Sequence, residues 1–182
     1  MKKIILTVFA VTSLLLYSTP SFALINFSVG VPLSHTFTGK WSGGTAIESD
    51  GVGGYFIQIG VPMLPGLGMD SHKAKIKTEA GLPFYVSTTM YNLYYILPIP
   101  IINLTLGVGT GKSQFELAGL KGDDGSATQW YTSLGIPILP LFDLHLSYRS
   151  ISSKIESTSG SDKGEKDDVG ANIMGLGIGF NF

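Results

Sequence analysis

Hydrophobic and polar residues alternate along most of this chain, and residues 169–182 show the pattern most clearly. They read VGANIMGLGIGFNF, with Met174, Leu176 and Ile178 on one parity and glycines on the other. Because side chains along a β-strand point alternately to its two faces, this stretch predicts a strand with one apolar and one narrow face. In a soluble sandwich such a final strand would leave an exposed apolar edge. A closed barrel in a membrane has no edge, and its outer face is apolar.

Seven earlier segments repeat the alternation and predict seven more strands. In the first of them, Phe27, Val29 and Val31 hold the apolar parity, while Ser28 and Gly30 hold the other. The seven segments cover residues 26–33, 54–61, 67–77, 85–95, 102–109, 129–136 and 143–149.

The segment at residues 67–77 departs from the regular pattern. Leu67 and Met69 are apolar at odd positions, whereas lysines take the odd positions from Lys73 on. A β-bulge inserts one residue and shifts the faces that follow it, so the pattern predicts a bulge near residues 70–72.

The connections between these segments predict how the strands are joined. Three Pro-rich turns begin at Pro62, Pro98 and Pro137, which lie 36 and 39 residues apart. This spacing fits two strands of about ten residues with one loop and one turn. The sequence therefore predicts an all-β protein, an eight-stranded antiparallel transmembrane up-and-down β-barrel with its short turns and both termini on the periplasmic side. The longer polar loops are expected at residues 38–50, 79–83, 120–127 and 156–168.

The first 23 residues have the layout of a secretory signal peptide. Lys2 and Lys3 precede an apolar run at residues 4–17, and a small-x-small site follows at residues 21–23. The run is shorter than the roughly 20 residues that a spanning helix needs, which disfavours a membrane anchor. We expect cleavage after Ala23, so that residues 1–23 are the signal peptide and residues 24–182 the barrel.

Composition adds support for a barrel and excludes one class of partner. Glycine accounts for 24 of 182 residues, about twice the usual share of roughly 7%, and charged residues make up 14%. The chain has no cysteine, so no disulfide stabilises it. It is acidic once Lys2 and Lys3 are removed, and it therefore lacks the basic surface that nucleic acid requires.

The ending GIGFNF resembles the C-terminal strand of bacterial outer-membrane barrels, whose terminal aromatic residues are read by the assembly machinery. The whole region after the signal resembles small eight-stranded barrels of the OmpX, OmpW and OmpA-domain type, with Gly-rich OmpW-related proteins the most similar. The resemblance implies a location in the outer membrane of a Gram-negative cell, in contact with its lipid. It also implies that periplasmic chaperones and the barrel-assembly machinery are partners, with Phe180 and Phe182 as the assembly signal. It identifies no extracellular ligand.

Charged and polar residues predicted to face the lumen are the first candidates for a functional site. The interior of an eight-stranded barrel is just wide enough for side chains to fill it, so we expect a paired structural plug rather than a transport or gating site. The charges expected to face inward also include Lys112, Lys154 and Glu79. The predicted cluster consists of Asp70, Lys73, Lys75, Lys77, Glu116, Asp143, His145 and Arg149.

His145 and Ser147 are the sharpest candidates for catalysis. An imidazole and a hydroxyl on one strand face can form an activated nucleophile, and the pair resembles that of barrel-shaped lipid A deacylases. The alternation with Leu144 and Leu146, however, directs the pair into the lumen, and the preceding turn places it at the periplasmic end. We therefore expect no catalytic residue.

No metal or cofactor site is expected either. The three histidines are scattered along the chain, without the close ligand spacing of known zinc sites. The acidic run at residues 123–125 is too short for a calcium-binding EF-hand loop.

These observations together predict a non-enzymatic integral outer-membrane barrel with an envelope-structural or surface-interaction role. One alternative is a narrow, porin-like pore for small or apolar solutes, motivated by Val86, Met90 and Tyr94 on the inward parity and by the resemblance to OmpW. The other alternative is a lipid-modifying barrel enzyme.

Overall fold

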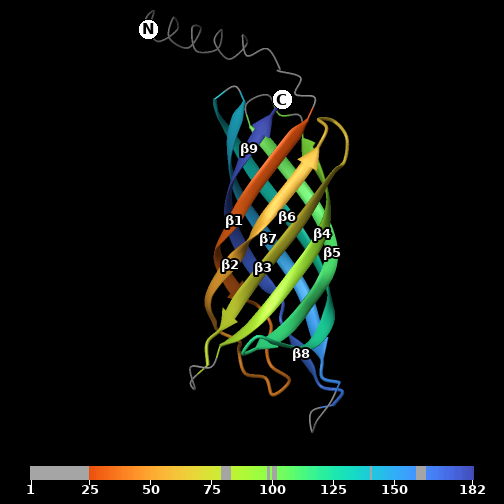
Figure 1. Ribbon diagram of the computed structural model, residues 1–182. Helices are drawn as coiled ribbons and strands as arrows, with labels where there is room; N and C mark the ends of the chain where they lie inside the picture. Colours follow the sequence, from red (N-terminus) through yellow and green to blue (C-terminus); the bar gives the residue numbers. More distant parts are fainter. Residues whose placement is uncertain (1–24, 79–82, 98, 100–101, 140, 159–162) are drawn as a thin grey trace, which may run out of the picture.

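The computed structural model describes residues 25–78, 83–97, 99, 102–139, 141–158 and 163–182 of the chain (Figure 1). The expected signal peptide at residues 1–23, most of the expected loop at residues 79–83 and the expected turn at Pro98 lie outside the described residues. No helix among the described residues is long and apolar enough to cross a membrane.

The described residues contain nine β-strands, eight of them long. Their bounds are β1 Asn26–Phe37, β2 Ser49–Gly60, β3 Gly66–Ile76, β4 Phe84–Leu97, β5 Asn103–Leu117, β6 Leu120–Leu139, β7 Phe142–Glu156, β8 Lys166–Asp168 and β9 Ala171–Asn181.

The eight long strands close into an antiparallel barrel. Each pairs with its sequence neighbour from β1 to β7, and β9 completes the circle by pairing with both β7 and β1. The short β8 pairs only with the end of β7, from Lys154 to Glu156. The prediction of an eight-stranded antiparallel barrel is thus confirmed, and closure removes the free apolar edge that β9 would otherwise present.

The two ends of the barrel differ (Figure 1). The described chain begins and ends at the same end, where Ile25 and Phe182 exchange backbone hydrogen bonds of 3.0 Å. The β2–β3, β4–β5 and β6–β7 connections lie at that end, which we call the turn end. The opposite end carries the β1–β2, β3–β4, β5–β6 and β7–β9 connections, and we call it the loop end.

Burial confirms the alternation that the sequence predicted. On β9, Met174, Leu176 and Ile178 are exposed on the outer face, while Ile173 is fully buried inside. The glycines on the inner face make room for large side chains, since a Cβ at Gly179 would lie 2.3 Å from His145 Nε2. The inner face of this strand therefore needs glycine where large side chains of the neighbouring strands occupy the lumen.

The predicted bulge near residues 70–72 is wrong. Pairing of β3 with β2 and β4 is continuous there, and the register of β3 with β2 shifts only between Ser49 and Val52 of β2. Ala74 and Ile76 point inward into an apolar cluster, so the alternation persists and Lys73 and Lys75 face outward. The prediction failed because it assumed a polar lumen along the whole length of the barrel.

The predicted loop at residues 120–127 is also wrong, because these residues belong to β6. They continue the hairpin with β5 to a two-residue turn at Ala118 and Gly119, whose φ angles of 50° and 84° match a type I′ turn. β6 has 20 residues, about twice the 9–11 that a tilted strand needs to cross a bilayer. The wall therefore has length to spare beyond a membrane, and polar outward residues occupy this part.

Candidate functional site

A buried ion pair crosses the middle of the barrel. Asp70 on β3 accepts a hydrogen bond of 3.1 Å from Arg149 Nε on β7, and these strands stand on opposite walls. Neither side chain reaches solvent, with residue exposures of 0% and 2%. The guanidinium carbon of Arg149 also lies 3.6 Å from the ring centroid of Phe56 and 4.9 Å from that of Tyr131. The cation is thus held by a carboxylate and two aromatic faces.

Amide side chains extend this pair into a network. Gln129 donates to Asp70 Oδ2 at 2.6 Å and to Asn92 Oδ1 at 2.5 Å, which joins β6 to β3 and β4. Gln58 donates to the Tyr131 hydroxyl at 2.7 Å, and its carbonyl accepts from Ser28 at 3.0 Å. Side chains from β1, β2, β3, β4, β6 and β7 therefore meet in the centre of the lumen.

A second polar layer lies toward the turn end. Asp143 Oδ2 accepts hydrogen bonds from Asn103 and, at 2.7 Å, from Asn181. Asn26 in turn donates to Asn181 Oδ1 at 2.6 Å. Sequence reasoning missed these three asparagines as site residues, although each holds the inward parity of its strand. Together with Asp143 they link β1, β5, β7 and β9 across this end of the lumen.

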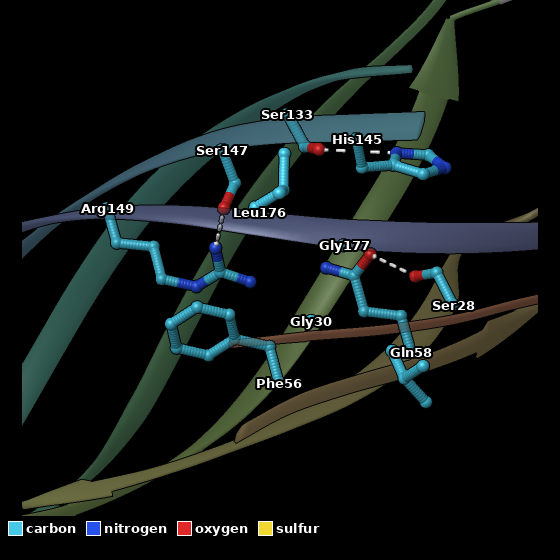
Figure 2. Close-up of a pocket in the computed structure, with 11 residues that line it drawn as sticks. Ser28, Gly30, Phe56, Gln58, Ser133, His145, Ser147, Arg149, Leu176 and Gly177 are labelled. Carbon is cyan, nitrogen blue, oxygen red and sulfur yellow. Dashed lines mark hydrogen bonds between the residues drawn. The ribbon is translucent and has the colours of Figure 1, made fainter. Parts of the chain in front are cut away.

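A small cavity remains between these layers (Figure 2). Its volume is about 20 Å³, which is room for little more than one water molecule. Its polar lining includes Ser28, Gln58, Ser133, His145 and Ser147. The cavity is too small for an organic solute.

His145 and Ser147 face the lumen, as predicted, but they do not contact each other as nucleophile and base. The Ser147 hydroxyl donates to the Gly175 carbonyl at 3.3 Å and accepts from Arg149 at 2.5 Å. His145 Nδ1 instead lies 3.4 Å from the Ser133 hydroxyl, and Figure 2 shows the two side chains directed to different partners. The Ser147 hydroxyl therefore donates its hydrogen to a backbone carbonyl and not to His145, so the two side chains are not arranged as nucleophile and base.

Two apolar clusters lie in the loop half of the lumen, which also buries the polar side chains of His72, Thr88, Ser113 and Ser153. Met90, Ile151 and Ile173 lie just beyond the ion pair. The larger cluster nearer the mouth comprises Phe37, Ile47, Ala74, Ile76, Val86, Ile155, Val169 and Ala171. Apolar residues on the inward parity of β3, β4 and β7 were the sequence signal for this cap.

The β1–β2 loop reaches across the mouth and completes the cap. Its Trp41 stacks on Phe84 of β4 and Phe115 of β5, with ring centroids 6.0 and 5.9 Å apart. Ile47 from the same loop is 5% exposed within the apolar cluster. The loop also binds the β7–β9 connection, since Ser42 donates to Asp167 at 2.8 Å and to Glu165 at 2.6 Å.

Trp41→Ala is expected to loosen this loop. Without the indole, the contacts that hold the loop over Phe84 and Phe115 are lost, so trypsin should cut after Lys40 several-fold faster in the folded protein. The matched control is Trp130→Ala, because Trp130 is 53% exposed on the outer wall and does not contact the loop. Gel analysis of timed digests measures both rates, and equal rates for the two variants would contradict the cap.

The charged candidates divide between the two faces of the wall. Four of the candidates lie inside, namely Asp70, Asp143, His145 and Arg149. The expected lumenal placement is wrong for Lys73, Lys75, Lys77, Lys112, Lys154 and Glu116, which lie on the outward parity of the wall. Glu79 lies outside the described residues. Lys73 pairs with Glu116 at 2.7 Å and Lys75 with Asp50 at 2.5 Å, all at the outer surface.

The third of these ion pairs joins Lys77 to Glu48 at 2.8 Å, just beyond the strands. The hydrogen bond from the Lys77 ammonium, and the attraction between the two charges, lower the pKa of the Glu48 carboxyl below its usual value. Both side chains are exposed at the loop end, so solvent screens this pair.

The expected assembly residues lie in an aromatic cluster outside the turn end. The Phe180 ring is 5.1 Å from Phe142 and 6.3 Å from Phe27, and it stacks on Phe182 at 6.4 Å. Such a cluster is typical of the aromatic girdle at a membrane interface.

The described residues include no group of three histidine, cysteine or acidic side chains arranged to hold a metal ion.

Several solved structures are similar to this chain. Neisserial surface protein A (NspA) superposes with a TM-score of 0.58 at 12% identity, over 87% of this chain and 96% of that chain. Ail, the attachment invasion locus protein of Yersinia pestis, gives a TM-score of 0.40 at 14% identity over 86% of this chain and 96% of that chain. The outer membrane protein OprG of Pseudomonas aeruginosa gives 0.37 at 13% identity over 87% and 95%.

The sequence matches no family model. It has no significant match among curated proteins. The superposition on NspA shows that the chain shares the fold of that protein.

Proposed function

We propose that this protein is an integral barrel of the outer membrane of a Gram-negative bacterium, with an envelope-structural or surface-interaction role and no catalytic activity. Its outer face supports a lipid environment, because Leu134, Leu146 and Leu176 form a continuous exposed row across β6, β7 and β9. Exposure of such an apolar row to water is unfavourable, whereas contact with the hydrocarbon of a bilayer is favourable.

In this proposal the turn end faces the periplasm and the loop end faces outward. Short turns on the periplasmic side and longer loops outside are the rule for such barrels. Residues 1–23 would direct export and be removed. The aromatic cluster around Phe180 and Phe182 would then be read by the barrel-assembly machinery after periplasmic chaperones deliver the chain.

The closed lumen is the observation that carries the structural role. The Asn–Asp layer, the Arg149–Asp70 network and the apolar cap follow one another along the barrel axis, so a solute meets three barriers of different chemistry. Side chains from opposite walls are bound to one another across the lumen, which obstructs an aqueous path along the barrel axis. This arrangement favours a plug over the narrow pore.

Planar-bilayer recording tests the closed lumen. The refolded protein is expected to produce no single-channel steps in a bilayer where an open porin, added as a positive control, does. Slower gel migration after boiling confirms that the sample was folded before insertion. Reproducible conductance steps from the wild-type protein would overturn the plug and restore the pore.

A further inference from the structure

Three rows of side chains cross the outer face of β5, β6 and β7. Backbone pairing sets the strands in register, and each row takes one outward residue from each strand. Lys154 belongs to the third row because it lies one residue beyond the Ala127–Ser153 pair. From the turn end toward the loop end, the rows are Val108, Trp130 and Ser150, then Thr110, Thr128 and Ser152, then Lys112, Ser126 and Lys154.

The rows change from mainly apolar to hydroxyl to cationic over a short distance. Successive outward residues of a strand stand about 6.7 Å apart, so the whole change takes roughly 13 Å. Trp130 contacts Tyr148 with ring centroids 5.6 Å apart, which adds a broad aromatic surface at the apolar level. A membrane lipid shows the same order from its acyl chains through its hydroxyl-bearing backbone to its phosphate.

The third row provides the groups that bind phosphate. Lys112 and Lys154 stand on either side of β6, about 10 Å apart at the backbone, with the exposed Ser126 between them. The Lys112 side chain is 73% exposed and pairs with Asp124 at 3.0 Å, which leaves two of its three N–H donors free. No carboxylate of the described residues lies within ion-pair distance of Lys154. Both flexible side chains can therefore turn toward one anion above Ser126.

We propose that this wall binds one phosphorylated lipid of the leaflet at the loop end. Lys112 and Lys154 hold its phosphate with the Ser126 hydroxyl, the row of Thr110, Thr128 and Ser152 faces its polar backbone, and its acyl chains lie along Trp130. The proposal rests on the membrane location proposed above. A lipid, rather than a free anion, is favoured because the cationic row continues directly from the lipid-facing surface.

Native mass spectrometry of the refolded full barrel in detergent tests the proposal. The probes are diphosphorylated lipid A, the same lipid after removal of its phosphates, and inorganic phosphate as a competitor. The variant Lys112→Gln/Lys154→Gln removes both cations. The control Lys121→Gln/Lys163→Gln removes the same charge from two exposed residues at the loop end, neither of which pairs with a residue of the three rows.

The wild-type protein and the control are expected to retain the phosphorylated lipid equally, and the Lys112→Gln/Lys154→Gln variant about tenfold less. The dephosphorylated lipid should bind as weakly to the wild type as the phosphorylated lipid binds to that variant. Equal retention by all three proteins would overturn the proposal. Full displacement by millimolar inorganic phosphate would also overturn it, in favour of a site for free anions.

Two further measurements keep failure of this proposal separate from failure of the proposed function. Slower gel migration after boiling shows that each variant is folded. Membrane fractionation of the wild type tests the location independently of lipid retention. A folded protein that fractionates with the outer membrane but retains lipid equally in all forms would refute the lipid site alone.

Discussion

Arg149→Leu is expected to destabilise the barrel by about 3 to 5 kcal/mol, because it leaves the carboxylate of Asp70 buried without its cation. Asp70 is fully buried, and Gln129 would remain as its one side-chain donor among the described residues. The same change also removes the cation from the faces of Phe56 and Tyr131. Urea unfolding from phosphatidylcholine vesicles, followed by tryptophan fluorescence, measures the loss.

Two control variants separate the buried charge from a general effect of losing a lysine or arginine. Lys121→Leu removes an exposed cation at the loop end and should change the free energy of unfolding by less than about 0.5 kcal/mol. Asp70→Asn/Arg149→Leu removes both charges and should recover a large part of the stability lost by Arg149→Leu. An Arg149→Leu protein that unfolds at the wild-type urea concentration would show that the ion pair does not hold the lumen together.

Leu146→Arg is the second change with a large expected effect. Leu146 lies between Leu134 and Leu176 on the outer wall, so the new cation would enter hydrocarbon at a cost of about 2 to 4 kcal/mol near the midplane. Ser152→Arg places the same side chain on the same face of β7, three outward positions nearer the loop end and beside Thr128. At that level the cost should fall to about 0 to 1 kcal/mol.

The comparison of these two variants isolates depth, because strand, face and new side chain are the same. Urea unfolding from vesicles of one lipid composition gives both free energies. If Ser152→Arg were as destabilising as Leu146→Arg, the apolar band would not end where the hydroxyl row begins.

The alternation of side chains was enough to predict the barrel, its strand number and the faces of most strands. Val29, Leu93 and Leu146 each lie on an apolar parity that is unambiguous. A closed antiparallel sheet places all of these apolar faces against lipid and leaves no strand edge unpaired. The boundaries were harder to predict at the loop end. Residues 120–127 are polar and glycine-rich and were read as a loop, yet β5 supplies their backbone partners and extends the hairpin.

The charged site was predicted only in part. From the sequence, a polar interior was expected along the whole barrel, whereas the interior contains polar and apolar layers. Arg149, Asp70 and Asp143 are inside as expected, since their strands are regular there. Lys73 and Glu116 were placed inside because charge was assumed to avoid the outer face. That assumption holds within hydrocarbon and fails where β3 and β5 extend beyond the apolar band.

The most direct test of the account is the labelling of single cysteines in living cells, which the cysteine-free sequence allows. Gly43→Cys places a thiol in open space on the β1–β2 loop, and Leu64→Cys places one on the exposed β2–β3 turn. A membrane-impermeant maleimide should label Cys at position 43 in intact cells and at position 64 only after the outer membrane is opened. Labelling of the turn position in intact cells, or of neither position before lysis, would contradict a barrel that spans the outer membrane with its loops outside.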